Sequence, residues 1–469
     1  MPTVMSNRGL RKNSVCDRVR KHGKTPLLNR LSVRVATALV AVVIAVAIFT
    51  LVFGGAILNG YGKEKLERVF ARAYPGYALR IGKLDYNVGA NRLVAQSVML
   101  SSTNITLKTG QILLKDVHWA ALFWGTRTRA DILASVRLDA TNLVLELPQV
   151  HYGIRCARLR GSVRDSELIA EKAELLPLGG DEAFFAAHTF RTPRFHAVVP
   201  EFKVSGLAYA EVFEGKGYRA RSVQFSRPSF DALVNRDKPR EPFVKSPLML
   251  HEALAAIRLP LQVGNFSVTN GNFTYCERLA VGGDPAVLTF GDVSLAVEGI
   301  ANRGEATDTI QLHGQGDLMN AGTIKVLMII PVASPDFSMR YSGSMTAMDL
   351  TRLDGFLDIA EHTRIKSGSA QAATFEIDVT DGQAHGHVHA TYQDLEIALL
   401  DKETGSEEGV GARVASFFAN ALKIRNANTS SGSGPRKDGD VNYTRRPDDQ
   451  FQQFVWFALR TGVMDVISH

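Results

Sequence analysis

The feature that most constrains the fold of this chain is a period of two in its apolar residues, which recurs over much of the 469-residue sequence. The stretch RLPLQVGNFSVTNGNFTYCE, residues 258–277, is typical, because apolar and polar side chains follow each other in turn. Successive side chains of a β-strand point to opposite faces, so such a stretch forms a strand with one apolar and one polar face. The sequence therefore predicts a mainly β protein.

Turn residues divide these stretches into predicted antiparallel hairpins. Asn-Gly at 270–271 lies between two alternating arms. This dipeptide favours a two-residue turn in which both residues take positive φ. We therefore expect Val268 to face Phe273, and Phe266 to face Tyr275, across that turn.

The same signals extend along most of the chain. Further hairpins are expected across the turn residues 89–91 and 381–382, and strand patterns resume over 309–400. Residues 134–148 and 220–234 share a looser sequence pattern, in which a Ser-Val-x-apolar strand and a short break precede another alternating strand. Repetition of strand units indicates one antiparallel sheet that keeps adding strands.

Segments with helical spacing are few and short. Before residue 401 they are 62–75, 116–125, 246–257 and 349–363. Residues 179–200 fit neither the helical nor the alternating template, and we expect a loop or an irregular strand there.

The composition changes near residue 401, so residues 401–469 form a region of C-terminal helices and flexible linker. A helix is predicted over 412–424, a Ser, Gly and charge-rich linker over 425–449, and an amphipathic helix over 450–467. The terminal helix either caps the end of the sheet, which we favour, or lies on a membrane surface.

An uncharged apolar run occupies residues 35–58. A helix of that length spans a hydrocarbon layer of about 30 Å. A secretory signal peptide or a buried core helix are the alternatives, but a signal peptide has a shorter apolar core and a cleavage site of small residues. We therefore predict a transmembrane helix over 35–58, which separates residues 1–34 from a β-rich domain over 59–400.

Residues 1–34 hold nine Lys and Arg against one Asp, a charge of +8, so the rest of the chain carries −1 of the net +7. Because basic flanks stay on the cytoplasmic side, the prediction is a cytoplasmic N-terminal tail and an exported body. A nearly neutral body lacks the positive surface that binding to several phosphates requires, so nucleic acid is not an expected partner.

Catalytic motifs are absent from the sequence: there is no phosphate-binding G-x-x-x-x-G-K-[ST], no G-x-S-x-G, no H-E-x-x-H and no C-x-x-C. His385, His387 and His389 are expected on one face of a strand, where Asp381 could complete a metal site. The favoured interpretation is an exposed polar face with Val388 pointing the other way. We therefore expect no enzyme activity, no metal and no cofactor.

Cys156 and Cys276 would share the exported compartment, whereas Cys16 lies in the basic tail. Sequence alone does not place the two exported Cα atoms within disulfide distance, so their pairing stays open.

The order of these features is similar to a known family. ALRIGKLDYNVGANRLVAQSVML, LFWGTRTRADILASVRLDATNLVLELP and LPLQVGNFSVTNGNFTY resemble segments of AsmA-like proteins, a bacterial envelope family related to TamB and to bridge-type lipid transfer proteins. The resemblance covers roughly residues 60–466. It implies a long, curled β-sheet whose concave apolar face shelters acyl chains, anchored in the inner membrane with the bulk in the periplasm.

Alternating strands need a dry partner for their apolar face. Either one sheet curls into a groove that binds a lipid, or two sheets close on each other as a β-sandwich. In the first case the protein binds or transfers phospholipid or another membrane lipid, or assists envelope assembly. In the second it is a non-enzymatic scaffold that docks other envelope proteins. The groove candidates are Val263, Phe266, Val268, Phe273 and Tyr275.

Overall fold

The computed structural model describes residues 63–87, 89–117, 133–240, 246–279, 283–305, 307–332, 334, 336–400, 424–429 and 435–468. The predicted basic tail (1–34) and the apolar run (35–58) lie outside these residues, as do most of 116–125 and all but the last residue of the predicted helix over 412–424. Within the described residues, no helix is both long enough and apolar enough to cross a membrane.

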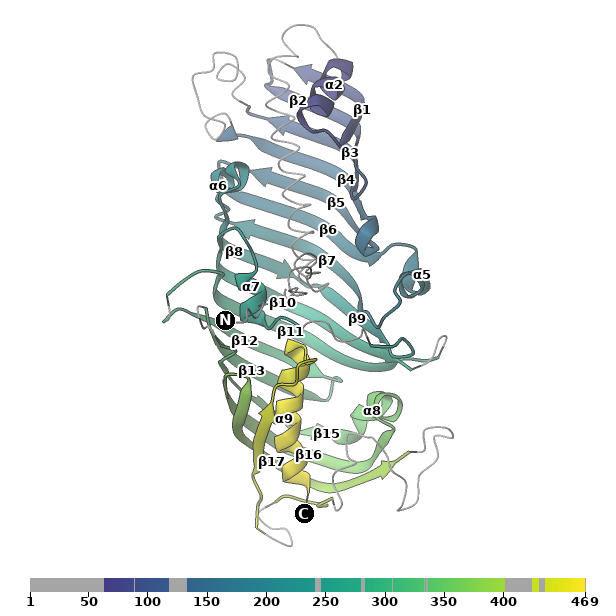
Figure 1. Ribbon diagram of the computed structural model, residues 1–469, viewed down its shortest axis with the longest axis vertical. Helices are drawn as coiled ribbons and strands as arrows, with labels where there is room; N and C mark the ends of the chain where they lie inside the picture. The colour runs from purple at the N-terminus through teal and green to yellow at the C-terminus, as the bar shows by residue number, and fades with distance from the viewer. Residues whose placement is uncertain are drawn as a thin grey trace, which may run out of the picture.

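The protein is mainly β, as the alternation predicts, and its described strands form one 18-stranded sheet (Figure 1). The two-layer sandwich considered above is not formed by these strands. In chain order the strands are β1 (Ala78–Asn87), β2 (Arg92–Ser101), β3 (Thr106–Lys115), β4 (Arg137–Leu147), β5 (Tyr152–Ser162), β6 (Glu167–Pro177), β7 (Arg194–Ser205), β8 (Tyr218–Ser226), β9 (Ser229–Asn235), β10 (Leu261–Arg278), β11 (Ala286–Ala301), β12 (Thr309–Leu318), β13 (Gly322–Pro331), β14 (Met339–Met345), β15 (Met348–Asp349), β16 (Thr363–Thr380), β17 (Gln383–Leu399) and β18 (Gly439–Thr444).

Most strands that follow each other in the chain pair antiparallel, although β14 and β15 both pair with β16 and not with each other. A second exception makes the sheet mixed rather than purely antiparallel as predicted. β8 and β9 are two pieces of one line of backbone, interrupted at Arg227 and Pro228. Both pieces pair antiparallel with β7 on one side and parallel with β10 on the other. Parallel neighbours need a crossover, so the chain returns between the end of β9 and the start of β10.

The hairpin predicted at Asn270-Gly271 is wrong, because β10 runs straight through this dipeptide. Asn270 does take a left-handed φ of 52°, but Gly271 is not among the glycines with positive φ. A type I′ turn needs both residues left-handed, whereas one such residue produces a β-bulge. Val268 and Phe273 therefore lie along one strand. The hairpins predicted at 89–91 and 381–382 are confirmed.

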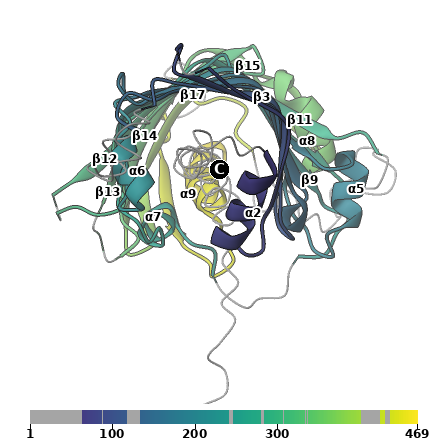
Figure 2. The same cartoon turned by 90° about the horizontal axis from the view of Figure 1, so that it is seen from above.

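A line of similar bends crosses the sheet from β2 to β11. At each bend either a residue pair is missing from the strand ladder or the register shifts, and one residue has a φ between 46° and 54°. These residues are Ser97, Asn142, Lys172, Arg227, Asn270 and Asp292. Bulges bend strands and increase their twist. The whole sheet curls around an interior that is open on one side (Figure 2).

The helices are α2 (Lys63–Ala73), α5 (Gly180–Ala186), α6 (Tyr209–Glu214), α7 (Leu250–Ala255), α8 (Asp354–Ala360) and α9 (Phe451–Ile467), with 3₁₀ turns η2 (Pro148–Val150) and η3 (Leu350–Leu353). α2, α7, α8 and α9 confirm four predicted helices. α2 and α9 lie inside the curled sheet (Figure 2).

Two other segment predictions are wrong in part. Residues 179–200 contain α5 and the start of β7, because Phe184 and Phe185 are buried side by side and tertiary packing decides the conformation. The predicted linker contains β18, whose short alternation of buried Val441 with exposed Asp440 and Asn442 is hidden in a polar stretch.

The two edges of the sheet are blocked by side chains from helices. At the β1 edge, the Ile81 amide donates a 2.8 Å hydrogen bond to Glu67 Oε1 of α2. At the β18 edge, the Asp440 amide donates to Asp465 Oδ2 of α9 at 2.9 Å. Covering edge amides in this way prevents pairing with strands of other molecules. The described cysteines, Cys156 and Cys276, are both free.

Candidate functional site

An unbroken apolar row crosses the inner face of the sheet, the face on which α9 lies. Directly paired residues of neighbouring strands point to the same side, so the printed registers can be followed from strand to strand. Every member of this row is apolar, aromatic or glycine. From β1 to β18 it contains Tyr86, Leu93, Leu114, Leu138, Gly161, Leu168, Val204, Val223, Phe266, Val297, Leu312, Met328, Tyr341, Ile377, Gly386 and Val441.

A second row runs beside the first, two residues along each strand, and it is equally free of charge. It contains Leu84, Ala95, Ile112, Ala140, Leu159, Ala170, Phe202, Phe225, Val268, Leu295, Gly314, Val326, Gly343, Phe375, Val388 and Gly439.

A third row lies on the other side of the line of bends and reaches from β1 to β13. Its first members belong to the same buried core as the first two rows, so it faces the same interior. It contains Leu79, Leu100, Leu107, Leu145, Ile154, Leu175, Ala197, Phe230, Phe273, Phe290, Leu318 and Gly322.

The outer face differs sharply in chemistry. The row that alternates with the two first rows contains Asp85, Val94, Leu113, Asp139, Arg160, Ile169, Lys203, Gln224, Ser267, Ala296, His313, Leu327, Ser342, Glu376, His387 and Asp440. Ion pairs connect neighbouring strands on this face, such as Lys203 with Glu167 at 2.8 Å and Arg340 with Asp378 at 2.6 Å. One side of the sheet is therefore wet and charged, and the other is continuous hydrocarbon.

Exposure along the inner rows is uneven. Leu93 and Leu114 of the first row are buried in a core formed around β1–β7. Tyr341 and Ile377 are buried in a second core, which includes α9. Between these cores, over β7–β11, most apolar side chains of these rows are only half-buried, whereas Val204 and Val297 are buried.

Seven half-buried phenylalanines form this middle section, which we call the phenylalanine patch. They are Phe202, Phe225 and Phe266 on one side of the line of bends, and Phe195, Phe230, Phe273 and Phe290 on the other. Neighbouring rings on adjacent strands have centroids 4.9–5.9 Å apart. Aromatic pairs at such distances attract each other beyond the burial of their area. The patch is therefore an ordered apolar surface.

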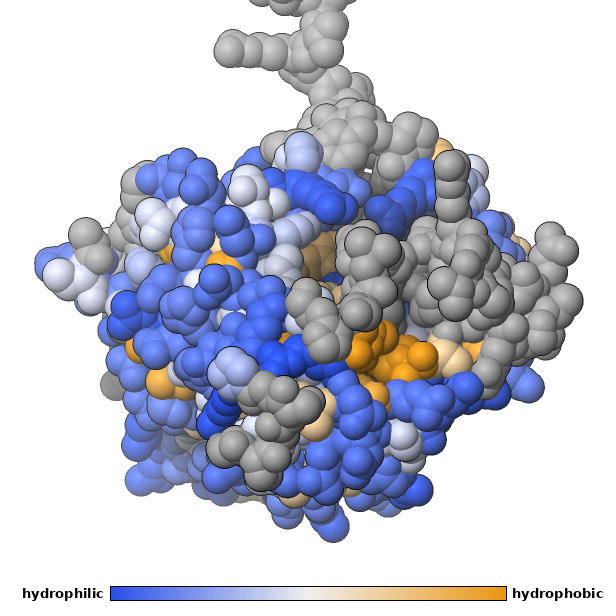
Figure 3. All heavy atoms as spheres, turned by 90° about the horizontal axis from the view of Figure 1, so that it is seen from below, coloured by the Kyte–Doolittle hydropathy of each residue, from blue (hydrophilic) through white to orange (hydrophobic). Residues whose placement is uncertain are grey.

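Hydrophobic side chains also show at the lower end of the molecule. In the view from below, they gather in the hollow between hydrophilic outer surfaces (Figure 3). A separate hollow of about 700 Å³ lies over β10–β14 and includes Val268, Leu295 and Val326. Its other lining residues are mostly polar or glycine, so it is not a purely apolar site.

The structure separates the five groove candidates. Phe266 lies in the first row, Val268 in the second and Phe273 in the third. Val263 pairs with Ala220 and Ile300 on its two sides, outside the patch.

Tyr275 also lies outside the patch. Its ring is 6.1 Å from that of Phe356 in α8, and its hydroxyl donates a 2.6 Å hydrogen bond to Glu277. Burial, followed by the charge of Glu277, raises the pKa of the Tyr275 hydroxyl, which therefore stays neutral. Its polar tip is thus engaged in the protein.

Five of the seven phenylalanines were not among the candidates from sequence. They are Phe195, Phe202, Phe225 and Phe230 on β7–β9 and Phe290 on β11. Each stands in an alternating stretch, which is the only local signal. Their assembly depends on strand registers that single stretches do not contain.

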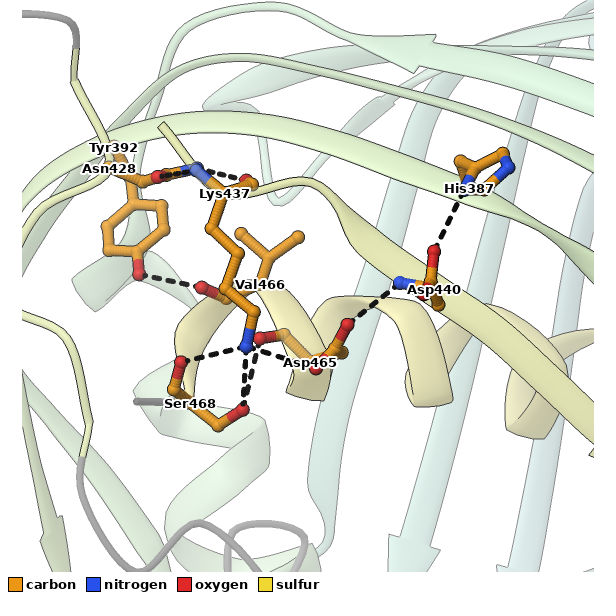
Figure 4. Close-up of polar contacts among 8 residues, drawn as sticks. All are labelled: His387, Tyr392, Asn428, Lys437, Asp440, Asp465, Val466 and Ser468. Carbon is orange, nitrogen blue, oxygen red and sulfur yellow. Dashed lines mark hydrogen bonds and ion pairs between the residues drawn. The ribbon is translucent and has the colours of Figure 1, made fainter. Parts of the chain in front are cut away.

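The three histidines of β17 lie on the outer face, with Val388 buried on the inner one. His387 Nδ1 is 3.0 Å from Asp440 Oδ1 (Figure 4), and His389 Nδ1 is 2.7 Å from Asp438 Oδ1. In the part of the chain that the structure describes, no three His, Cys, Asp or Glu side chains are grouped to hold a metal ion. Each of the two histidines has a single acidic partner and bridges β17 to the segment around β18.

No protein family matches this chain, and no curated protein is significantly similar to it. The likeness to AsmA-like proteins therefore stays a prediction from the quoted segments.

Proposed function

We propose that this protein is a lipid-binding or lipid-transfer protein of the bacterial envelope, or an envelope-assembly factor built on the same fold, whose inner face takes up acyl chains. The observation that carries the proposal is the set of three apolar rows without a charged side chain. Each methylene that leaves water contributes about 0.8 kcal/mol, and hydrocarbon needs no directional polar contact. Such a surface requires no catalytic residue.

The phenylalanine patch is the place where an acyl chain binds. Its side chains are apolar and half-buried, whereas the rows on both sides belong to filled cores. A chain laid over the patch covers the exposed parts of these rings, and the curled sheet shields it from water on the outer side.

The anchor in this proposal is the apolar run over 35–58, with the basic tail in the cytoplasm and the sheet in the periplasm. The length of the run and the flanking charges support this orientation. The resemblance to AsmA-like proteins supports the same placement in the inner membrane. The lipid partner is then a phospholipid or another lipid of that membrane.

A second candidate is a non-enzymatic scaffold that docks other envelope proteins. One observation favours it: large parts of the apolar rows are already covered by the chain's own residues, including α9. A scaffold of this kind leaves the middle of the sheet without a lipid.

One experiment separates the two. The full chain is purified in detergent and its extract is examined by mass spectrometry for copurifying phospholipid, and the protein is then mixed with vesicles that carry a labelled phospholipid. The proposal expects phospholipid in the extract and uptake from the vesicles. Absence of lipid in both measurements would overturn it and favour the scaffold.

A further inference from the structure

The C-terminal helix α9 occupies part of the apolar interior. Phe454 and Ala458 are fully buried, and Val466 is nearly so. They share a core with Tyr341, Ile377 and other members of the first two rows. α9 therefore lies where those rows would otherwise be exposed.

The helix approaches the sheet at backbone distance. A Cβ added at Gly462 would lie 2.5 Å from Val388 Cγ2 and 2.7 Å from Val441 Cγ2. Real Cβ atoms do not come this close to their neighbours, so glycine is required there. Packing of this density leaves no room for a hydrocarbon chain between α9 and the strands β17 and β18.

Polar contacts fix the C-terminal end of α9 (Figure 4). Lys437 Nζ is 3.0 Å from Asp465 Oδ1 and donates to the Ser468 carbonyl oxygen at 3.2 Å. Asn428, which is fully buried, donates to the carbonyl oxygens of Ala390 and Lys437 and accepts from the Lys437 amide. The segment that carries Lys437 is thereby tied to β17.

Aromatic contacts fix the N-terminal half of the helix. The ring of Phe337 lies 4.9 Å from that of Phe454, and the Arg445 guanidinium lies 5.8 Å from the Phe337 ring centroid. The Tyr341 hydroxyl donates a 3.2 Å hydrogen bond to the Val455 carbonyl oxygen. Contacts at both ends hold α9 as a fixed element of the fold.

We infer that α9 permanently fills one end of the apolar interior of the curled sheet, the end formed by the C-terminal strands. The helix thereby confines a bound hydrocarbon chain to the phenylalanine patch. This inference rests on the proposed function. A consequence is that lipid enters and leaves on the side of α9 that faces the phenylalanine patch. The protein then holds a lipid in the middle of the sheet and does not pass it along all its strands.

The test uses the full chain and a phospholipid with a radiolabelled acyl chain, supplied in phosphatidylethanolamine and phosphatidylglycerol vesicles. The photo-crosslinking residue p-benzoylphenylalanine replaces Phe266 in the patch, or Tyr341 beneath α9. The same probe is also placed at Met328, which pairs with Tyr341. This second position shows whether a result at 341 comes from a local distortion by the probe. Thermal unfolding checks that each variant is folded. The label is expected at 266 and not at 341 or 328.

Hydrogen exchange tests whether α9 moves. The backbone amides of α9 are expected to exchange at the same rate, within twofold, in the presence and absence of the phospholipid vesicles.

The outcomes distinguish the inference from the function on which it rests. Label at 341 or 328, or faster exchange of the α9 amides when lipid is present, would overturn the inference and leave lipid binding in place. Absence of label at all three positions, together with no uptake, would overturn the proposed function itself.

Discussion

Asn270 and Asp381 share the same left-handed backbone conformation, with φ of 52° and 49°, yet the chain continues straight through the first and reverses at the second. The residue that follows decides the outcome. Gly382 is also left-handed, with φ of 72°, whereas Gly271 is not. Two left-handed residues in succession make a hairpin turn, and one makes a bulge that bends the strand.

The bend at Asn270 makes a first prediction. Replacing Asn270 by Val places a β-branched side chain in the left-handed region, which costs about 1–2 kcal/mol. Asn270→Gly removes that penalty and should leave stability nearly unchanged. Urea unfolding of both variants measures the difference. Ser267→Val, at an ordinary position of the same strand, is the control, and an equal loss at 267 and 270 would contradict the bulge.

The two dipeptides also show what sequence can and cannot predict here. Alternation correctly places strands on both sides of Asn270 and Asp381, because side-chain period is a local property. The choice between bulge and turn depends on partners far away in the sequence. β10 is held on one side by β8 and β9 and on the other by β11, so both arms of the predicted hairpin are already paired.

The candidate site follows the same division. Phe266 and Phe273 are recognisable as apolar strand residues, and their placement on the inner face follows from alternation with one bulge between them. Phe225 and Phe230 become part of the same surface only through the parallel crossover, which no local pattern indicates. β18 was missed for a related reason, since its pairing with β17 gives order to a stretch of linker-like composition.

A charge in the phenylalanine patch makes a second prediction. Phe266→Asp puts a carboxylate on the inner face, whereas Ser267→Asp puts the same group on the outer face one residue away. Because Phe266 is half-buried, its replacement should cost about 1–3 kcal/mol of stability and leave the protein folded. Phospholipid uptake from vesicles should fall at least tenfold for Phe266→Asp alone. Equal uptake by the two variants would count against the patch as the binding surface.

The buried Asn428 makes a third prediction. Its side chain satisfies the Lys437 amide and two carbonyl oxygens, and Asn428→Ala leaves these groups without their partner. An unsatisfied buried group costs about 1–3 kcal/mol, so the free energy of unfolding should fall by at least that amount. Asn426→Ala is the matched control, because Asn426 is exposed and its amide makes one 3.3 Å bond. Similar losses in the two variants would show that the hydrogen bonds of Asn428 to Ala390 and Lys437 contribute no more to stability than the exposed one of Asn426.

Asp465 makes a prediction about pH. Burial alone raises the pKa of its carboxyl, but the Asp440 amide and Lys437 outweigh burial, and the pKa lies below the usual Asp value. A lowered pKa in the folded protein contributes stability above the unfolded pKa, and this contribution is lost as the pH falls through the folded pKa. The stability difference between the protein and Asp465→Asn should therefore be largest at neutral pH and shrink in acid. Urea unfolding from pH 7 to pH 3 measures it, and a difference that grows in acid would contradict the arrangement.

The last prediction concerns the thiol of Cys276. This residue pairs with Leu233, and both are buried in the core that includes Phe185 of α5. Burial, followed by the charge of Asp231, raises the pKa of the Cys276 thiol to about 11, so little thiolate forms near neutral pH.

Iodoacetamide at pH 8 should accordingly leave Cys276 unmodified in the folded protein and alkylate it in urea. Cys156 is the internal comparison, since its side chain is only half-buried, although burial raises its pKa as well. Mass spectrometry of the peptides measures both sites in one sample. Labelling of Cys276 in the folded protein as fast as that of Cys156 would mean that α5 does not cover the Cys276 thiol. The low reactivity depends on that cover, because the sequence around the thiol is the same in the folded protein and in urea.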